Sequence, residues 1–183
     1  MRSIVVFVAA LLVSASAFAA PASSYEIEVL VFETKFPEWE ASELWTHVAR
    51  PAEAATTGTE ALPPTAEFSS MISAFRADSH YRVLLHKHWV QPAESKGTGT
   101  PVPLTTPDKE LNGGIKFYLS RFLHLELNVA YQPQPGPVGG VDKSADNPPT
   151  YIINEQRRIK SNELNYFDHP KFGVLVRVTP VTG

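Results

Sequence analysis

The sequence lacks several features that would each indicate a particular class of protein. It contains no cysteine, which excludes disulfides, thiolate metal sites, a cysteine nucleophile and a lipid-modified N-terminal cysteine. It also lacks a surplus of basic residues, because 16 Lys and Arg stand against 19 Asp and Glu, which argues against nucleic-acid binding. The composition that remains, 43% hydrophobic and 19% charged over 183 residues, is typical of one globular domain.

The only long apolar run lies at the N-terminus. Arg2 precedes an unbroken apolar stretch from Ile4 to Val13, and an A-x-A cleavage pattern ends at Ala19. These three parts together are typical of a secretory signal peptide, and the run is much shorter than the roughly 20 residues of a membrane-spanning helix. We therefore expect a signal peptide over residues 1–19. The mature chain, 20–183, is then expected to be a single exported domain with no membrane insertion after cleavage.

Most of the 16 prolines are concentrated in three stretches, 50–65, 91–108 and 132–149. Proline cannot donate a hydrogen bond in a sheet, and these stretches also carry many Gly, Thr and Ala residues. We interpret them as long loops that separate the regular elements of the domain.

Apolar and polar residues alternate between these loops with the period of two that is typical of strands. Every second residue from Tyr25 to Val31 is apolar, which predicts a strand over 25–33. A second strand is predicted over 81–90. Its expected core face consists of Tyr81, Val83, Leu85 and Trp89, and its opposite face carries Arg82, His86 and His88.

The alternation from Ile115 to Tyr131 is too long for one strand in a domain of this size. A reversal of the chain near Arg121 would divide this stretch into two shorter strands. A three-residue turn pairs Phe117 with Leu125 and keeps the apolar faces together, whereas a two-residue turn mixes them, so we predict a hairpin with an odd-length turn.

The remaining elements complete an α+β fold. The apolar spacing in 67–77 predicts a helix, and a weaker stripe predicts another over 38–48. Two late segments, 151–160 and 172–181, read as a hairpin joined through a turn at 168–171. We predict an antiparallel β-sheet built from β-hairpins, with one or two helices packed on one face.

Four blocks of the sequence, 25–33, 81–92, 120–127 and 157–176, resemble the CsiV family of gammaproteobacterial periplasmic proteins. The last block, Arg-Arg-x-x-Ser-x-Glu-Leu-x-Tyr-x-Asp-His-Pro-x-Phe-Gly, is the most specific of the four. The resemblance implies a peptidoglycan-binding protein that supports cell-wall integrity and cell shape, with no established catalysis.

Candidate ligand-binding residues are polar or aromatic side chains within these blocks or beside the predicted hairpin turn. They are Arg82, His86, Tyr118, Arg121, His124, Arg157, Arg158, Tyr166 and His169. Arginine can hold the carboxylates of peptidoglycan stem peptides bidentately, and an exposed tyrosine offers a flat face to a sugar ring. Tyr118 lies off the apolar face of its strand and is therefore the preferred aromatic platform, whereas Trp89 is expected in the core.

Two other arrangements are open to more than one interpretation. His86 and His88 share a strand face and could ligate a metal, but no third ligand is evident in the sequence, so two half-exposed histidines are favoured. Asp168-His169-Pro170 could be a catalytic Asp–His pair, but ordinary turn chemistry explains it better. We expect no catalytic residues, no metal and no cofactor.

Three functions follow in order of preference. The first is a non-catalytic periplasmic protein that binds peptidoglycan. The second is a periplasmic adaptor that binds an envelope or cell-wall enzyme through a sheet edge or a loop, and the third is a wall hydrolase.

Overall fold

The computed structural model describes residues 24–35, 61–134 and 149–181, which form one helix and eight strands. The elements are β1 (Ser24–Thr34), α1 (Ala66–Ala77), β2 (Tyr81–Pro92), β3 (Val102–Pro103), β4 (Leu111–Leu119), β5 (Leu123–Tyr131), β6 (Tyr151–Ile159), β7 (Leu164–His169) and β8 (Phe172–Val181). All of the strand pairings are antiparallel. The predicted α+β class is therefore confirmed. The predicted signal peptide and the weaker helix over 38–48 lie outside the described residues.

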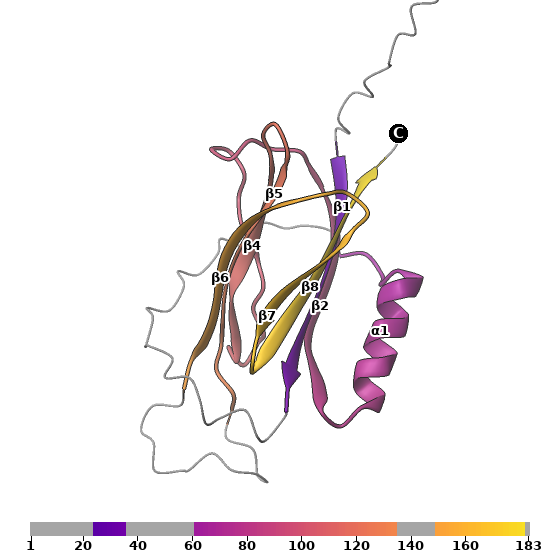
Figure 1. The fold of residues 1–183 in the computed structure, drawn as a ribbon, viewed down its shortest axis with the longest axis vertical. Coiled ribbons are helices and arrows are strands. Elements are labelled where there is room, and N and C mark those ends of the chain that lie inside the picture. The colour runs from indigo at the N-terminus through magenta and orange to yellow at the C-terminus, as the bar shows by residue number, and fades with distance from the viewer. Residues whose placement is uncertain (1–23, 36–60, 135–148, 182–183) are drawn as a thin grey trace, which may run out of the picture.

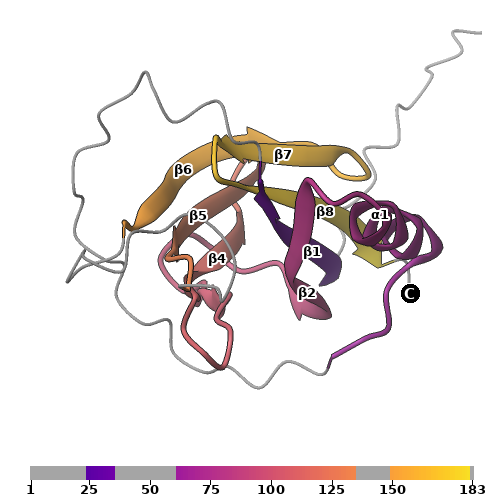
Figure 2. The same ribbon diagram turned by 90° about the horizontal axis from the view of Figure 1, so that it is seen from below.

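The strands divide into two sheets rather than one (Figure 1). Sheet A has the order β2-β1-β8-β7, and sheet B has the order β3-β4-β5-β6. The main core lies between them and contains Ile27 and Val29 from β1, Trp89 from β2 and Leu127 from β5, all at most 1% exposed. Figure 2 shows the two sheets joined along one side, where β6 of sheet B continues into β7 of sheet A.

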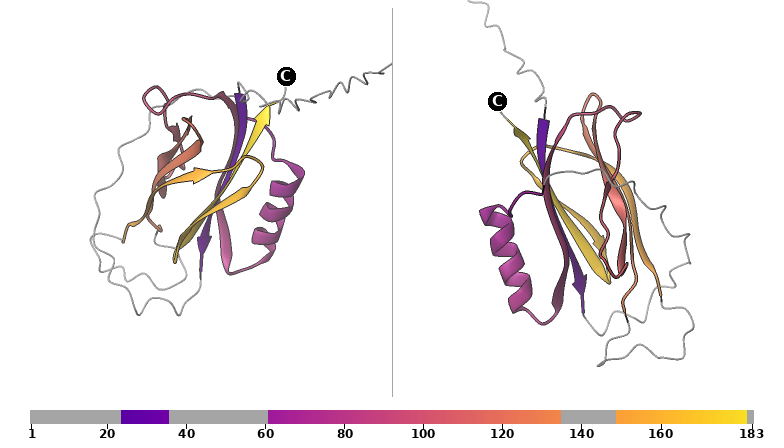
Figure 3. Two further views of the ribbon diagram at one scale, coloured as in Figure 1. Left: turned by 45° about the horizontal axis from the view of Figure 1, so that its top comes forward. Right: turned by 180° about the vertical axis from the view of Figure 1, so that it is seen from behind.

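Helix α1 packs on the outer face of sheet A, away from sheet B (Figure 3). Its apolar stripe, centred on the buried Phe68 and Ile72, covers Leu30 and Phe32 of β1. The helix begins after Thr65, whose hydroxyl caps it by accepting from the Phe68 amide. The helix predicted over 67–77 is confirmed, as is its position on one face of the sheet.

A β-bulge changes the faces that we predicted for β2. Val31 of β1 pairs with Leu85 but Phe32 pairs with Val83, so Leu84 is an extra residue. The extra residue turns the first part of the strand over, because side chains alternate between faces. Leu85 and Trp89 consequently face the main core, whereas Tyr81 and Val83 pack against the helix, and the prediction of one common face was wrong.

The predicted hairpin of 115–131 is confirmed. Strands β4 and β5 are joined by the three residues 120–122, and Phe117 pairs with Leu125. The pair begins earlier than predicted, at Leu111. Gly113 makes this extension possible, because its φ is +141° and a Cβ there would lie 2.1 Å from the backbone oxygen of Asn128.

The prediction that 151–160 and 172–181 pair as a hairpin was wrong. The segment 151–160 forms β6, which pairs with β5 in sheet B, and β8 pairs instead with β7, a strand that we did not predict. The chain crosses between the sheets at 160–163, where Asn162 has a φ of +63° and donates its amide to Val178. The predicted turn is present but narrower, because only Pro170 and Lys171 separate β7 from β8.

The stretch 91–108 is more structured than a spacer. Strand β2 extends into it as far as Pro92, and β3 pairs with β4 at Ile115. Between them the chain runs beside the edge of β4, where the Glu94 carbonyl accepts from the Leu119 amide at 2.8 Å. The other two predicted loops fall largely outside the described residues. Within the described part of the chain, no helix is long and apolar enough to cross a membrane.

Candidate functional site

A pocket of about 530 Å³ opens on the outer face of sheet A, beside the C-terminal end of α1. Phe32 and Leu175 line it from the sheet, and Phe75 lines it from the helix. Residues 166–170, from the end of β7 and the turn after it, contribute Tyr166, Asp168, His169 and Pro170. We call this the aromatic pocket. Its volume lies in the range of small-molecule sites, about 300–1,000 Å³.

Four aromatic rings set the shape of the aromatic pocket. Phe32 stacks on Phe75 at 4.4 Å between ring centroids and meets the edge of Tyr81 at 5.7 Å. On its other side, the ring of Tyr166 lies nearly parallel to that of Phe32, at 6.2 Å and 9°. Phe32 is buried, whereas Tyr166 is 44% exposed. The pocket therefore has a buried aromatic centre and one solvent-facing ring.

Gly173 lets the two parallel rings come together over β8. A Cβ at this position would lie 2.6 Å from Phe32 Cζ and 2.7 Å from Tyr166 Cε2, closer than such atoms approach. Glycine inside a strand often marks a place where another group approaches closely. Here the approaching groups are the two rings of the aromatic pocket.

The polar groups of the aromatic pocket come mainly from Asp168 and His169, which are adjacent in β7 and whose side chains point to opposite faces of the strand. The Tyr166 hydroxyl donates to Asp168 Oδ1 at 2.6 Å, and partial burial together with this hydrogen bond raises the pKa of Tyr166. His169 is buried, its Nδ1 accepts from the Lys171 amide at 3.1 Å, and burial lowers its pKa. Asp168 and His169 therefore have separate partners, as ordinary turn chemistry requires.

A second cluster lies on the outer face of sheet B. Tyr118, His124 and Arg158 form one row across β4, β5 and β6. The ring of Phe122, in the turn, has the Arg158 Cζ 3.4 Å and the Arg121 Cζ 5.5 Å from its centroid. Within the described residues, no carboxylate lies within ion-pair distance of either guanidinium. We call Arg121 and Arg158 the outer arginine pair.

Tyr118 does not provide the exposed platform that we predicted. It is only 2% exposed, because His124 stacks on its ring at 4.9 Å and 3° and the segment carrying Lys96 covers it. Its hydroxyl accepts from Gln156 at 2.7 Å. The alternation along the strand correctly placed Tyr118 off the apolar face. It could not show that the ring is covered, because the segment that covers it lies in 91–108, which we interpreted as a loop.

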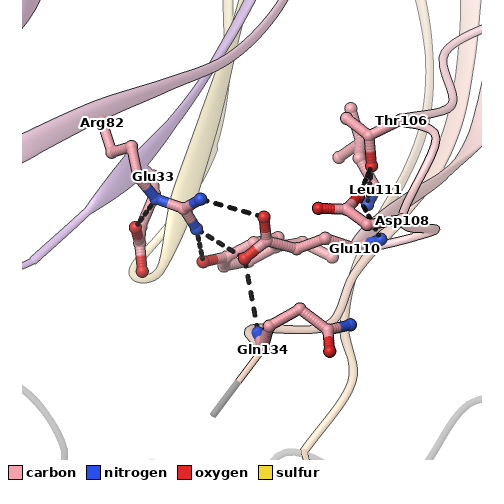
Figure 4. Close-up of polar contacts among 8 residues, drawn as sticks. Glu33, Arg82, Thr106, Asp108, Glu110, Leu111 and Gln134 are labelled. Atoms are coloured by element: carbon pink, nitrogen blue, oxygen red, sulfur yellow. Dashed lines mark hydrogen bonds and ion pairs between the residues drawn. The ribbon is translucent and has the colours of Figure 1, made fainter. Parts of the chain in front are cut away.

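Arg82 connects the two sheets (Figure 4). Its Nε donates to Glu33 of β1 at 2.7 Å, and its two terminal nitrogens donate to Glu110 at 2.9 and 2.5 Å. Glu110 is buried and also accepts from the Gln134 amide. These contacts, with Glu110 foremost, raise the pKa of Arg82. The arginine is thus occupied by internal carboxylates, and no pattern in the sequence indicated Glu110 as its partner.

Arg157 is occupied in a similar way. It points into the space between the sheets, where its guanidinium lies 4.1 Å from the ring centroid of Phe167. It donates to the Tyr166 carbonyl at 2.8 Å and pairs with Glu155. Arg157 and Arg158 are neighbours in the sequence, yet they lie on opposite faces of β6 because side chains alternate along a strand.

His86 and His88 lie on the outer face of sheet A and bind carboxylates of β1. His86 Nε2 lies 2.8 Å from Glu28, and His88 Nε2 lies 2.5 Å from Glu26. The buried Glu28 also accepts from the Thr65 amide and hydroxyl, which fixes the start of α1 to the sheet. Within the described residues, no group of three or more His, Asp or Glu side chains could hold a metal ion.

The nine candidate residues therefore do not form one site. Tyr166 and His169 line the aromatic pocket, while His124 and Arg158 lie on the outer face of sheet B and Arg121 lies in the adjoining turn. The remaining four, Arg82, His86, Tyr118 and Arg157, make internal contacts. Four further pocket residues, Phe32, Phe75, Tyr81 and Asp168, were not among the predicted site residues. Apolar periodicity placed only Phe75 and Tyr81 on buried faces, and it left Phe32 off the predicted apolar face of its strand.

The sequence profile of one protein family, described as "Peptidoglycan-binding protein, CsiV", matches residues 57–181. This match covers more than half of the chain. The chain belongs to the CsiV family. The suspected resemblance is thereby confirmed. The CsiV match spans α1 and strands β2 to β8, which contain the outer arginine pair and most of the aromatic pocket, but not Phe32 and Thr34 of β1. No curated protein and no solved structure gave a significant match.

Proposed function

We propose that this CsiV-family chain is an exported, non-catalytic periplasmic protein that binds peptidoglycan and thereby supports cell shape. The observation that carries the proposal is the family match, because that family is described as peptidoglycan-binding and the match covers the outer arginine pair and most residues of the aromatic pocket. The N-terminal pattern of residues 1–19 supports export.

The outer arginine pair suits the carboxylates of peptidoglycan stem peptides. Both arginine residues are exposed, both guanidiniums lie near the Phe122 ring, and the described part of the chain places no acid within ion-pair distance of them. Guanidinium groups bind carboxylates bidentately, and contact with an aromatic face limits their motion. From the sequence we expected all four candidate arginines to bind carboxylates. We now propose this role for Arg121 and Arg158 alone.

Co-sedimentation of the mature chain with purified wall sacculi tests the proposal. We expect the wild-type protein to pellet with the sacculi, and Arg121→Gln/Arg158→Gln to bind several-fold more weakly. Lys35→Gln/Arg76→Gln is the matched control, because it removes the same charge from exposed positions after β1 and in α1, away from the outer arginine pair.

Three results would contradict parts of the proposal. Wild-type protein that stays in the supernatant would refute direct wall binding and favour the adaptor function. Equal weakening by both double variants would show that overall charge matters rather than the outer arginine pair. Release of soluble muropeptides from the sacculi would refute a non-catalytic role.

A further inference from the structure

We propose that the aromatic pocket is a saccharide-binding site that takes a neutral sugar unit of the glycan strand. This inference rests on the proposed function and assigns part of it to a second surface. The pocket lies on the outer face of sheet A, whereas the outer arginine pair lies on the outer face of sheet B. The two sites can therefore contribute to wall binding independently.

The first argument is the exposed ring. Tyr166 is 44% exposed although tyrosine is large and mostly apolar, and it lines the pocket instead of packing into the core. The carbon–hydrogen face of a pyranose ring is flat and apolar, and an aromatic face in water is a suitable surface for it. Phe32, Phe75 and Tyr81 add apolar wall on the other side.

The second argument is that the exposed ring is held rigidly. Its face is set by Gly173 beneath it, by the parallel ring of Phe32, and by the hydrogen bond from its hydroxyl to Asp168. A ring fixed on three sides loses little conformational entropy when a ligand stacks on it. Gly173 has no positive φ and lies at no β-bulge, so the close approach of the two rings is what explains a glycine at this position.

The third argument is the charge of the pocket. Among the described residues that line the pocket, Asp168 is the only acidic one and none is Lys or Arg, while burial lowers the pKa of the adjacent His169. Asp168 Oδ1 accepts from Tyr166, while Oδ2 accepts no hydrogen bond within the described residues. A carboxylate with an open oxygen accepts hydrogen bonds from sugar hydroxyl or amide groups, and it repels the carboxylates of stem peptides. The pocket therefore fits a neutral sugar rather than an anionic peptide.

Titration with chitotetraose, a neutral tetramer of N-acetylglucosamine, tests the inference because this probe carries no peptide. Binding to the mature chain can be followed by the chemical shifts of residues 166–170. We expect saturable binding by the wild type, at least a tenfold loss in Tyr166→Ala, and a smaller loss in Tyr166→Phe, which keeps the ring. Asp168→Asn, which keeps the shape but removes the charge, should weaken binding several-fold.

Leu164→Ala is the matched control, because Leu164 lies on the same strand, is 40% exposed and does not line the pocket. Gly173→Ala provides a second variant that leaves every polar group in place. Its added methyl must displace the rings of Phe32 and Tyr166, so we expect it to reduce chitotetraose binding about as much as Tyr166→Ala does.

The outcomes separate this inference from the proposed function. Wild-type chain that pellets with sacculi but does not bind chitotetraose would overturn the inference and leave the function standing. Chitotetraose binding that Tyr166→Ala and Gly173→Ala leave unchanged would also overturn it. A stem peptide that binds in the pocket when chitotetraose does not would also overturn the inference, because the ligand would then be a peptide. Saturable chitotetraose binding lost in both variants would support it, even if the chain did not bind sacculi.

Discussion

The arginines between the sheets differ from those on the outer face of sheet B. Arg82 and Arg157 are surrounded by carboxylates, carbonyls and an aromatic ring of their own chain. Arg121 and Arg158 share one aromatic ring and meet no carboxylate within the described residues. The same residue type in the same family blocks thus serves the fold in one place and is available to a ligand in the other.

The largest effect should come from breaking the contact between the sheets. Arg82→Met leaves the buried Glu110 without a cationic partner, and removing one member of a buried ion pair typically costs about 3–5 kcal/mol. Because the Arg82 side chain is 41% exposed, we expect a smaller loss, roughly 2–3 kcal/mol of unfolding free energy. Urea denaturation measures it.

A second substitution checks the reason for that loss. Arg82→Met/Glu110→Gln no longer buries an unpaired charge, so it should recover part of the stability. A double variant less stable than Arg82→Met would show that Glu110 has important partners other than the arginine.

Arg157 and Arg158 allow the sharpest form of the comparison, because they are adjacent in the sequence. Arg157→Gln loses the contact with Phe167 and the hydrogen bond to the Tyr166 carbonyl, for which we expect a loss of about 1–2 kcal/mol. Arg158→Gln should change stability by less than about 0.5 kcal/mol, as surface substitutions usually do, yet weaken wall binding. Equal stability losses in the two variants would remove the distinction.

The smallest effect concerns pH and the buried His169. Burial lowers its pKa in the folded state below the usual value of about 6.5, so the unfolded state binds more protons in this range. Its contribution is therefore present above pH 6.5 and is lost as the pH falls through the lowered pKa. Urea denaturation of wild type and His169→Gln at pH 7.5 and 5 should show the wild type losing more stability on acidification. The opposite sign would contradict burial as the cause.

The sequence predicted local structure better than it predicted long-range partners. The β4–β5 hairpin was predictable because its register depends on one turn length and one apolar face. The pairing of β6 with β5, and not with β8, depends on a crossing between sheets that no periodicity records. The bulge at Leu84 changed the face of Tyr81 in the same way, since one extra residue is invisible in the pattern of polar and apolar residues.

The candidate site shows the same limit. Alternation could place Arg157 and Arg158 on opposite faces, but it could not indicate which face lies between two sheets until the second sheet was known. The aromatic pocket joins residues from β1, α1, β2, β7 and β8, so only the fold brings them together. Tyr166, Asp168 and Phe32 lie within the family blocks, but only Tyr166 was predicted as a site residue, and Phe75 carried no signal beyond burial.

Amide chemical-shift mapping with a soluble disaccharide–tetrapeptide muropeptide tests the central claim most directly. This ligand carries both a sugar and carboxylates, and the shifts report every region of the chain at once. We predict changes at the 120–122 turn and around Arg158, and at residues 166–170 of the aromatic pocket, with little change around Arg82 and Glu110. Changes centred on Arg82 and Glu110, or none at either outer surface, would contradict the division between arginines that hold the fold and surfaces that bind the wall.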